Sequence, residues 1–291
     1  MNILYIVFGN NQQHHTQAYF SICTFLGQMT TNDRIYMLTD APQFYQRLGD
    51  RIKVIETSQS LLTEWSGEHD FFWRIKIKAI EHICLLHPEE AVVYLDTDTF
   101  LYEQLSSLKI ALQKPIMHLN EGQLSALKSK TERKMWSEVG AKSFGGMTIA
   151  PHHCMWNAGV VGLPAQSLDT VRLALAICDD MLAAGVTRRL IEQFSLAVAL
   201  SQKGEVQAAE SFIAHFWAAK EEWNKLIQDV TLRSFLEGST VEQDIVTISK
   251  LDFTTVPISQ RIPNTQIRFK KWIEKRFPTE KKQYLTRLST N

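Results

Sequence analysis

The sequence predicts an α/β fold in which helices cover both faces of a mainly parallel central sheet. Short apolar runs rich in Val, Ile and Tyr alternate along the chain with longer segments whose apolar residues have helical spacing. Such alternation is typical of βαβ units, whose strands are parallel because each helix returns the chain across the sheet. A chain of 291 residues with 45% hydrophobic residues can form one large domain, or one domain with an added lobe.

The first half of the chain shows the alternation most clearly. In chain order, the predicted elements are a strand at 2–8, a helix at 16–29, strands at 34–38 and 52–55, a helix at 73–86 and a strand at 91–95. The first strand ends at Gly9, and the second ends at Thr39 and Asp40. The second helix should stop at His87-Pro88, because the residue before a proline is disfavoured in the α conformation.

The second half is less regular. Residues 120–147 carry a charged patch and the pair Gly145-Gly146, which suits a mobile or substrate-facing segment. The run Asn157-Ala158-Gly159-Val-Val-Gly-Leu predicts a short strand whose glycines allow a close approach of the backbone to another group. Helices are then predicted at 168–184, 188–200 and 221–236.

Charge and cysteine content exclude several classes of protein. The formal net charge is zero, which argues against a general nucleic-acid binder. The four cysteines are scattered without a CxxC pair, so neither a zinc ribbon nor a disulfide framework is expected. No run approaches the roughly 18 apolar residues of a membrane span. The N-terminus lacks the basic region of a signal peptide, which predicts a cytoplasmic protein.

The end of the strand at 91–95 is the strongest functional signal. Asp96 and Asp98 follow this apolar run directly, separated by Thr97. Ligands of open α/β sheets bind at the carboxyl ends of the strands. Two carboxylates there favour Mg²⁺ or Mn²⁺, which prefer oxygen ligands and often bind phosphorylated substrates. The alternative is a pair of solvated aspartates in a turn.

Two later segments could complete such a site. His215 lies among aromatic residues, where a neutral imidazole could be a third metal ligand or simply a core histidine. Lys220 follows it and could neutralise phosphate. Asn157 offers a donor and an acceptor suited to sugar hydroxyls, although it could equally belong to a turn.

In this order, YLDTD at 94–98, NAG at 157–159 and His215 with Lys220 resemble the GT-A glycosyltransferases, especially the glycogenin and lipopolysaccharide galactosyltransferase-like group. The resemblance covers roughly residues 1–225 and implies a Rossmann-like GT-A fold. It implies a metal held by Asp96, Asp98 and His215, with Mn²⁺ or Mg²⁺ as cofactor. It also implies a nucleotide-diphosphate sugar donor, with a UDP-sugar favoured, and a glycan or lipid-linked acceptor.

Further donor contacts are implied by the same resemblance. They are Phe8 and Asp40 near the base, and Arg74, Lys78, Asp96 and Lys220 around the diphosphate. Asn157 would contact a sugar, and Glu192-Gln193 would either contact the transferred sugar or lie on an ordinary helix surface. The chain departs from the family at HFWAAKEEW, where the family has H-x-x-G-x-x-K-P-W, so Lys220 is placed less firmly than His215.

Other classes fit parts of the same pattern. YLDTDTF also matches the D-x-D-x-T motif of haloacid dehalogenase-type phosphatases, with Asp96 as nucleophile. That family carries the motif on its first strand and has a later acidic motif, whereas Asp179-Asp180 here lies in a helical pattern. A nucleotidyltransferase would show a glycine-rich phosphate loop, which Phe8-Gly9-Asn10-Asn11 is not. A sugar-nucleotide-binding domain without turnover is the non-enzymatic alternative.

The C-terminal part differs in character from the rest. We expect a nucleotide-sugar-binding and catalytic domain at 1–240 and an extension with a basic, aromatic helical tail at 241–291. From Arg268 to Arg287, eight Lys or Arg stand against two Glu, so this segment carries a net charge of +6 and the remainder −6. Residues 266–288 could contact the inner face of an anionic membrane, or their aromatics could pack on the domain.

Overall fold

The computed structural model describes residues 1–259 and 264–277. The chain divides into a compact unit, Met1–Ile258, and a second unit, Ser259–Asn291. In the second unit the described secondary structure is the helix α10 (Asn264–Arg276), whose Phe269, Trp272 and Ile273 are exposed. The part of the predicted tail at 278–288 lies outside the described residues.

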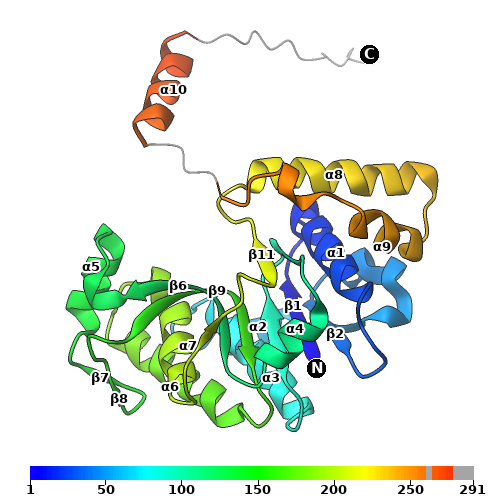
Figure 1. The fold of residues 1–291 in the computed structure, drawn as a ribbon. Coiled ribbons are helices and arrows are strands. Elements are labelled where there is room, and N and C mark those ends of the chain that lie inside the picture. The colour runs from blue at the N-terminus through cyan, green and yellow to red at the C-terminus, as the bar shows by residue number, and fades with distance from the viewer. Residues whose placement is uncertain (260–263, 278–291) are drawn as a thin grey trace, which may run out of the picture. The chain divides into compact units, whose positions relative to one another are not determined.

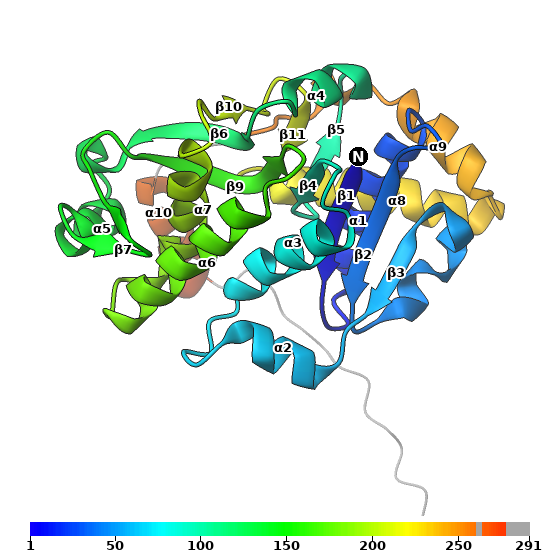
Figure 2. The same cartoon turned by 90° about the horizontal axis from the view of Figure 1, so that it is seen from below.

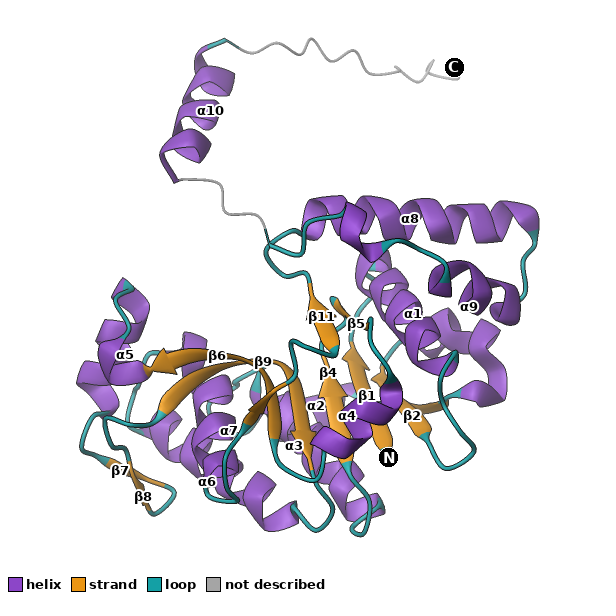
Figure 3. Cartoon of the chain, in the orientation of Figure 1, coloured by secondary structure: helices purple, strands orange, loops and turns teal. Residues whose placement is uncertain are grey.

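Seven strands of the first unit form the central sheet, in the order β10-β6-β9-β4-β1-β2-β3 (Figures 1 and 3). These strands are β1 (Asn2–Val7), β2 (Arg34–Thr39), β3 (Lys53–Glu56), β4 (Val92–Leu95), β6 (Ile116–Gln123), β9 (Cys154–Leu163) and β10 (Gln207–Ala208). Strand β1 is parallel to both β2 and β4, and β2 is parallel to β3. The predicted α/β class with a mainly parallel sheet is therefore confirmed.

Two short strand pairs lie outside this sheet. They are β5 (Thr99–Leu101) with β11 (Ile213–His215), and β7 (Ser143–Phe144) with β8 (Met147–Thr148). The first pair continues the chain directly after β4, at the carboxyl edge of the sheet, and joins it to a segment more than 100 residues later.

Helices cover both faces of the sheet (Figure 2). The helices are α1 (Gln12–Leu26), α2 (Gln59–Ser66), α3 (Arg74–Leu86), α4 (Leu105–Ala111), α5 (Lys130–Val139), α6 (Leu168–Ala183), α7 (Ile191–Ser201), α8 (Lys220–Glu237) and α9 (Val241–Ser249). Helices α2, α3, α6 and α7 pack on one face, and α1 and α4 pack on the other. The central strands are apolar on both faces for this reason, and their sequences are almost continuous hydrophobic runs.

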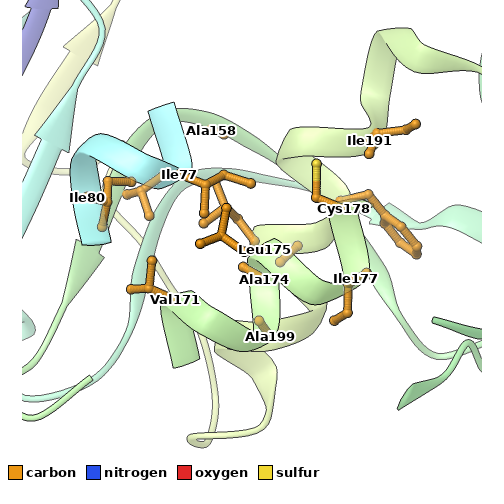
Figure 4. Packing of buried hydrophobic residues seen from close by; sticks show 14 of the residues in the cluster. Ile77, Ile80, Ala158, Val171, Ala174, Leu175, Ile177, Cys178, Ile191 and Ala199 are labelled. Atoms are coloured by element: carbon orange, nitrogen blue, oxygen red, sulfur yellow. The ribbon is translucent and has the colours of Figure 1, made fainter. Parts of the chain in front are cut away.

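The larger core lies between the sheet and the helices α3, α6 and α7. Ile77 and Ile80 of α3 meet Ala174 and Leu175 of α6, with Ala158 of β9 beside them (Figure 4). Helices α6 and α7 pack on each other with Ala174, Ala197 and Ala199 buried, and α3 contacts β4 while α7 contacts β9.

Several boundaries differ from those expected. The strand beginning at Asn157 starts earlier, at Cys154, and is antiparallel to both β4 and β6. The segment 120–147 is more ordered than expected, because Ser129 and Glu132 form a capping box that starts α5. The compact first unit extends past residue 240, where we expected the catalytic domain to end. Val241 and Ile248 of α9 are buried against the first unit, which therefore extends to Ile258.

Candidate active site

Strand β4 carries Asp96 to the centre of the sheet edge. Its neighbours are β1 and β9, and the Asp96 N–H continues the pairing by donating to the Gly159 carbonyl at 2.8 Å. Because side chains alternate along a strand, Tyr94 and Asp96 share a face. The Tyr94 hydroxyl donates to Asp96 Oδ1 at 2.6 Å, which fixes the direction of that carboxylate.

The β5–β11 pair brings His215 to the acidic residues. Thr99 lies opposite His215 in this antiparallel ladder, and the Phe216 N–H donates to the Asp98 carbonyl at 3.0 Å. His215 Nε2 lies 3.3 Å from Asp98 Oδ1. One ligand atom from each of Asp96, Asp98 and His215 lies within 4.8 Å of the others. The structure thus brings together the three residues that we expected to hold a metal.

The ring of His215 is enclosed by small and planar neighbours. A Cβ at position 159 would lie 2.2 Å from His215 Cε1, so only glycine leaves room for the ring. The ring of His118 meets that of His215 edge to face, with centroids 5.0 Å apart. His215 Nδ1 lies 3.1 Å from Asn157 Oδ1. The glycine of the NAG segment therefore has the close-approach role expected from the sequence.

A cavity of about 360 Å³ opens beside the acidic residues. Its wall includes Asp96, Asp98, Phe8, His14, Phe72, Trp73, Lys76 and Lys220. Lys220 Nζ lies 2.7 Å from Asp98 Oδ2, and half of the lysine side chain remains exposed. The cavity combines aromatic walls with cations and carboxylates at one end, which suits a ligand that has an apolar ring and an anionic group.

Behind Asp96 lies a buried network of charges. Lys76 of α3 is 7% exposed, and its Nζ lies 2.9 Å from Glu192 Oε1 and 3.5 Å from Asp96 Oδ1. Lys76 also donates to the Ala158 carbonyl at 3.2 Å and lies over the ring of Tyr94. Glu192 is thus a buried partner of Lys76 and not part of an ordinary helix surface.

The predicted cations of α3 do not line the cavity. Arg74 forms a bidentate pair with Asp179, and Lys78 pairs with Glu81 on its own helix. Lys76 lies nearest to the acidic residues instead. The sequence held a signal for this, because Lys76 shares one helical face with Ala79, Ile80 and Ile83, whereas Lys78 does not.

The remaining predicted residues occupy varied positions. Phe8 lines the cavity, with its ring edge to face with Phe72. Asp40, at the end of the neighbouring strand β2, accepts the N–H of Gly9 at 2.8 Å. Gln193 lies 3.1 Å from the sulfur of Met155, on α7 beside Glu192. His14 and Tyr94 were not expected from the sequence, although the Tyr-x-Asp spacing places Tyr94 on the face of Asp96.

Burial and neighbouring charges shift the pKa values of several titratable groups around the site. Burial would raise the pKa of Asp98, but the hydrogen bond and charge of His215, together with Lys220, hold it well below its usual value. Burial would lower the pKa of Lys76, yet Asp96 and Glu192 raise it. Burial raises the pKa of Glu192 despite the neighbouring lysine. Burial, together with the charge of His215, lowers the pKa of His118 to about 4.

Comparison with known proteins finds no matching family model and no matching curated sequence. Solved structures that resemble the chain include mouse xyloside xylosyltransferase 1, with 12% identity, TM-score 0.47, and coverage of 72% of this chain and 85% of that one. A second is the bifunctional glycosyltransferase WbbM, with 10% identity, TM-score 0.49, and coverage of 72% of this chain and 38% of that one. A third is the galactosyltransferase LgtC in complex with donor and acceptor sugar analogues, with 12% identity, TM-score 0.46, and coverage of 72% of this chain and 73% of that one. Similarity at this level does not assign a function, which has to come from the residues of the site.

The donor set fits a divalent cation. Two carboxylates and one imidazole suit Mn²⁺ or Mg²⁺, and a nearby lysine suits the anionic group that such an ion would bind. The three residues come from β11 and from the turn after β4, so folding has to bring them together. This arrangement can hold a metal–phosphate unit at the end of an aromatic-walled cavity.

Proposed function

We propose that this protein is a metal-dependent glycosyltransferase that moves a sugar from a nucleotide-diphosphate sugar to an acceptor hydroxyl. One observation carries the proposal: Asp96, Asp98 and His215 converge beside Lys220 at the edge of a cavity walled by Phe8 and Trp73. The order of these residues in the chain is also the one that the resemblance to GT-A enzymes implies.

In the proposed reaction, the acceptor oxygen bonds to the anomeric carbon. The bond from that carbon to the β-phosphate oxygen breaks, and its electron pair stays with the nucleoside diphosphate. The hydroxyl proton leaves to the departing diphosphate or to solvent. Asp96, Asp98 and His215 would hold Mn²⁺ or Mg²⁺, which supplies positive charge against the charge that grows on the leaving group.

Side chains of the protein have separate parts in this proposal. Lys220 would neutralise charge on the diphosphate, because its side chain is half exposed at the cavity edge. Lys76 and Glu192 would keep Asp96 in place from behind, which is the role that we propose for Glu192 in place of direct chemistry. Phe8 would lie against the base, with Asp40 near it, and Gln193 and the Asn157 amide would face the transferred sugar.

The phosphatase alternative fits the site less well. It needs a second acidic pair near the nucleophile, but Asp179 pairs with Arg74 and Asp180 accepts the N–H of Gly145 at 2.6 Å. Neither residue lines the cavity beside Asp96. The later acidic motif that this class places beside the nucleophile is therefore not supplied by Asp179 and Asp180, and the transferase is the better explanation.

Thermal-shift assays with Mn²⁺ and a panel of nucleotide-sugars test the proposal. A ligand at 100 times its dissociation constant stabilises a protein by about 2.7 kcal/mol, so a bound UDP-sugar should raise the melting temperature by several degrees. p-Nitrophenyl phosphate serves as the control substrate. Turnover of this ester without any effect of nucleotide-sugars would favour the phosphatase. Binding without donor hydrolysis or transfer to any of a panel of sugar acceptors would favour a non-catalytic domain.

The acceptor and the location are finer parts of the proposal. Among the described residues, no helix is long and apolar enough to cross a membrane. We propose a glycan or lipid-linked acceptor, with a cytoplasmic enzyme whose tail contacts an anionic membrane. The exposed Phe269 and Trp272 of α10, together with its lysines, support this contact.

A further inference from the structure

The side-chain oxygen of Asn157 accepts two hydrogen bonds from within the protein. The N–H of Gly159 donates to Asn157 Oδ1 at 2.9 Å. His215 Nδ1 lies 3.1 Å from the same oxygen. Both contacts arise because Asn157 and Gly159 lie two residues apart on β9, against the face of the β11 histidine.

The first of these bonds determines the chemistry of the second. A backbone N–H can only donate, so the amide atom facing Gly159 is the oxygen and not the nitrogen. An amide oxygen can only accept, so the His215 nitrogen beside it has to carry a proton. The other ring nitrogen, Nε2, points toward Asp98 Oδ1 at 3.3 Å.

We propose that Asn157 is a positioning residue, which keeps the ring proton of His215 on Nδ1 and presents Nε2 to a divalent metal. The inference rests on the metal site of the proposed function. In this arrangement Nε2 would be the ring nitrogen that holds the metal, while the Nδ1 proton stays in its hydrogen bond to Asn157 Oδ1. Outer partners of this kind are common for histidine ligands, because they fix both the tautomer and the ring direction.

Packing already restrains the position of the His215 ring, so what is left to determine is which ring nitrogen carries the proton. Gly159 on one side and His118 at the edge already restrict the ring position. A ring held in this way still binds no metal through Nε2 if its proton sits there. Asn157 therefore adds a proton-placing function to a ring that packing has already oriented.

A consequence follows for substrate contact. Because Oδ1 is used twice within the protein, the Nδ2 group is the part of Asn157 that can reach a sugar. Asn157 can then donate to a sugar oxygen but cannot accept from a sugar hydroxyl. Substitution with aspartate separates the two roles, since a carboxylate keeps both internal acceptor bonds and loses the donor.

The experiment compares Asn157→Leu and Asn157→Asp with a matched control, Asn120→Leu. Asn120 makes the same local bond, from the N–H of Gly122 at 2.8 Å, but lies exposed on β6 and accepts nothing from His215. Affinity for Mn²⁺ alone is measured by electron paramagnetic resonance. The protonation of each His215 nitrogen is read from ¹⁵N ring shifts in protein saturated with diamagnetic Mg²⁺, assigned with a His215→Gln spectrum.

We expect Asn157→Leu to weaken Mn²⁺ binding about 10- to 100-fold, as is typical for an outer partner of a metal ligand. Asn157→Asp should bind Mn²⁺ at least as well as the wild type and keep the proton on Nδ1. Asn120→Leu should change neither measurement.

Two results would overturn the inference. One is a folded Asn157→Leu protein that binds Mn²⁺ within threefold of the wild type. The other, which applies even if the leucine variant does not fold, is an Asn157→Asp protein whose ring proton lies on Nε2. Neither readout uses a nucleotide-sugar, so a negative transferase assay does not contradict this inference. Conversely, a ring proton found on Nε2 does not contradict the proposed transferase activity.

Discussion

Asp96 and Asp98 are separated only by Thr97, yet their carboxylates meet two different environments. Asp96 belongs to the α3–α7 side, where Tyr94 donates to it and Lys76 and Glu192 lie buried behind it. Asp98 belongs to the β11–α8 side, where His215 is buried but Lys220 is half exposed at the cavity edge. On the first, closed side, Lys76 and Glu192 are buried among packed helices, although Asp96 itself is partly exposed. On the second, open side, Asp98 is buried, and its partner Lys220 is open to a ligand.

The difference shows how one motif can serve two purposes. On the closed side, charges satisfy one another away from water, so losing one leaves its partner buried and unpaired. On the open side, the half-exposed Lys220 can turn from Asp98 to a ligand phosphate, because His215 stays beside the Asp98 carboxylate. We infer that Lys76 and Glu192 on the α3–α7 side hold the geometry and that Lys220 on the β11–α8 side meets the anionic part of the substrate.

The largest effect should come from Lys76→Met on the closed side. This change leaves Glu192 buried without its cation, and breaking a buried pair costs about 3–5 kcal/mol. The control is Lys78→Met on the same helix, whose pair with Glu81 is partly exposed and contributes at most about 1 kcal/mol. Urea unfolding measures both, and adding Glu192→Gln to Lys76→Met should recover part of the loss. Equal losses in the two single variants would remove the distinction between Lys76 and Lys78.

Asp98→Asn tests the open side. The variant keeps the size of the side chain but removes a metal ligand, so transferase activity should fall at least about a hundredfold, or about 3 kcal/mol. Mn²⁺-dependent nucleotide binding should weaken with it. Asp169→Asn, an exposed change in the first turn of α6, is the control. Activity within threefold of the wild type in Asp98→Asn would refute the proposed metal site.

Gly159→Ala tests the packing of β9 against the His215 ring, between the α3–α7 side and the β11–α8 side. The added methyl would lie 2.2 Å from the His215 ring, and overpacking of this kind costs about 1–3 kcal/mol. Metal affinity should fall as the ring is displaced. The double variant Gly159→Ala, His215→Ala should regain stability without regaining the metal. If the double variant is no more stable than Gly159→Ala alone, the clash is not with His215.

The smallest effect on the fold should come from removing residues 259–291. The aromatic cluster of Phe100, Trp223 and Phe253 stays intact, and the Trp223 indole still donates to the Pro257 carbonyl at 3.0 Å. The melting temperature and the activity on a water-soluble acceptor should be almost unchanged. Sedimentation with anionic vesicles should be lost, since each basic residue near such a surface adds about 1 kcal/mol. A lower melting temperature with unchanged vesicle binding would show that the tail is structural.

The amino-acid sequence by itself determined the local parts of this protein. Most strands and helices could be located from apolar residues that recur every two or every 3.6 residues, because this spacing reflects which face of an element is buried. The apolar run before Asp96 and Asp98 placed both carboxylates at a strand end. We expected Lys78 at the site and not Lys76, although the helical face that Lys76 shares with Ala79 and Ile80 is the one that marks a buried lysine.

Tertiary structure decided what depends on pairing between distant segments. The sequence has nine histidines, and the register of β11 against β5, with His215 opposite Thr99, is what brings one of them to Asp98. The antiparallel direction of β9 places Gly159 under that ring. Whether α9 belonged to the first unit depended on the burial of Val241 and Ile248. Local propensity carries no record of such contacts, because they form only when segments far apart in the chain exclude water together.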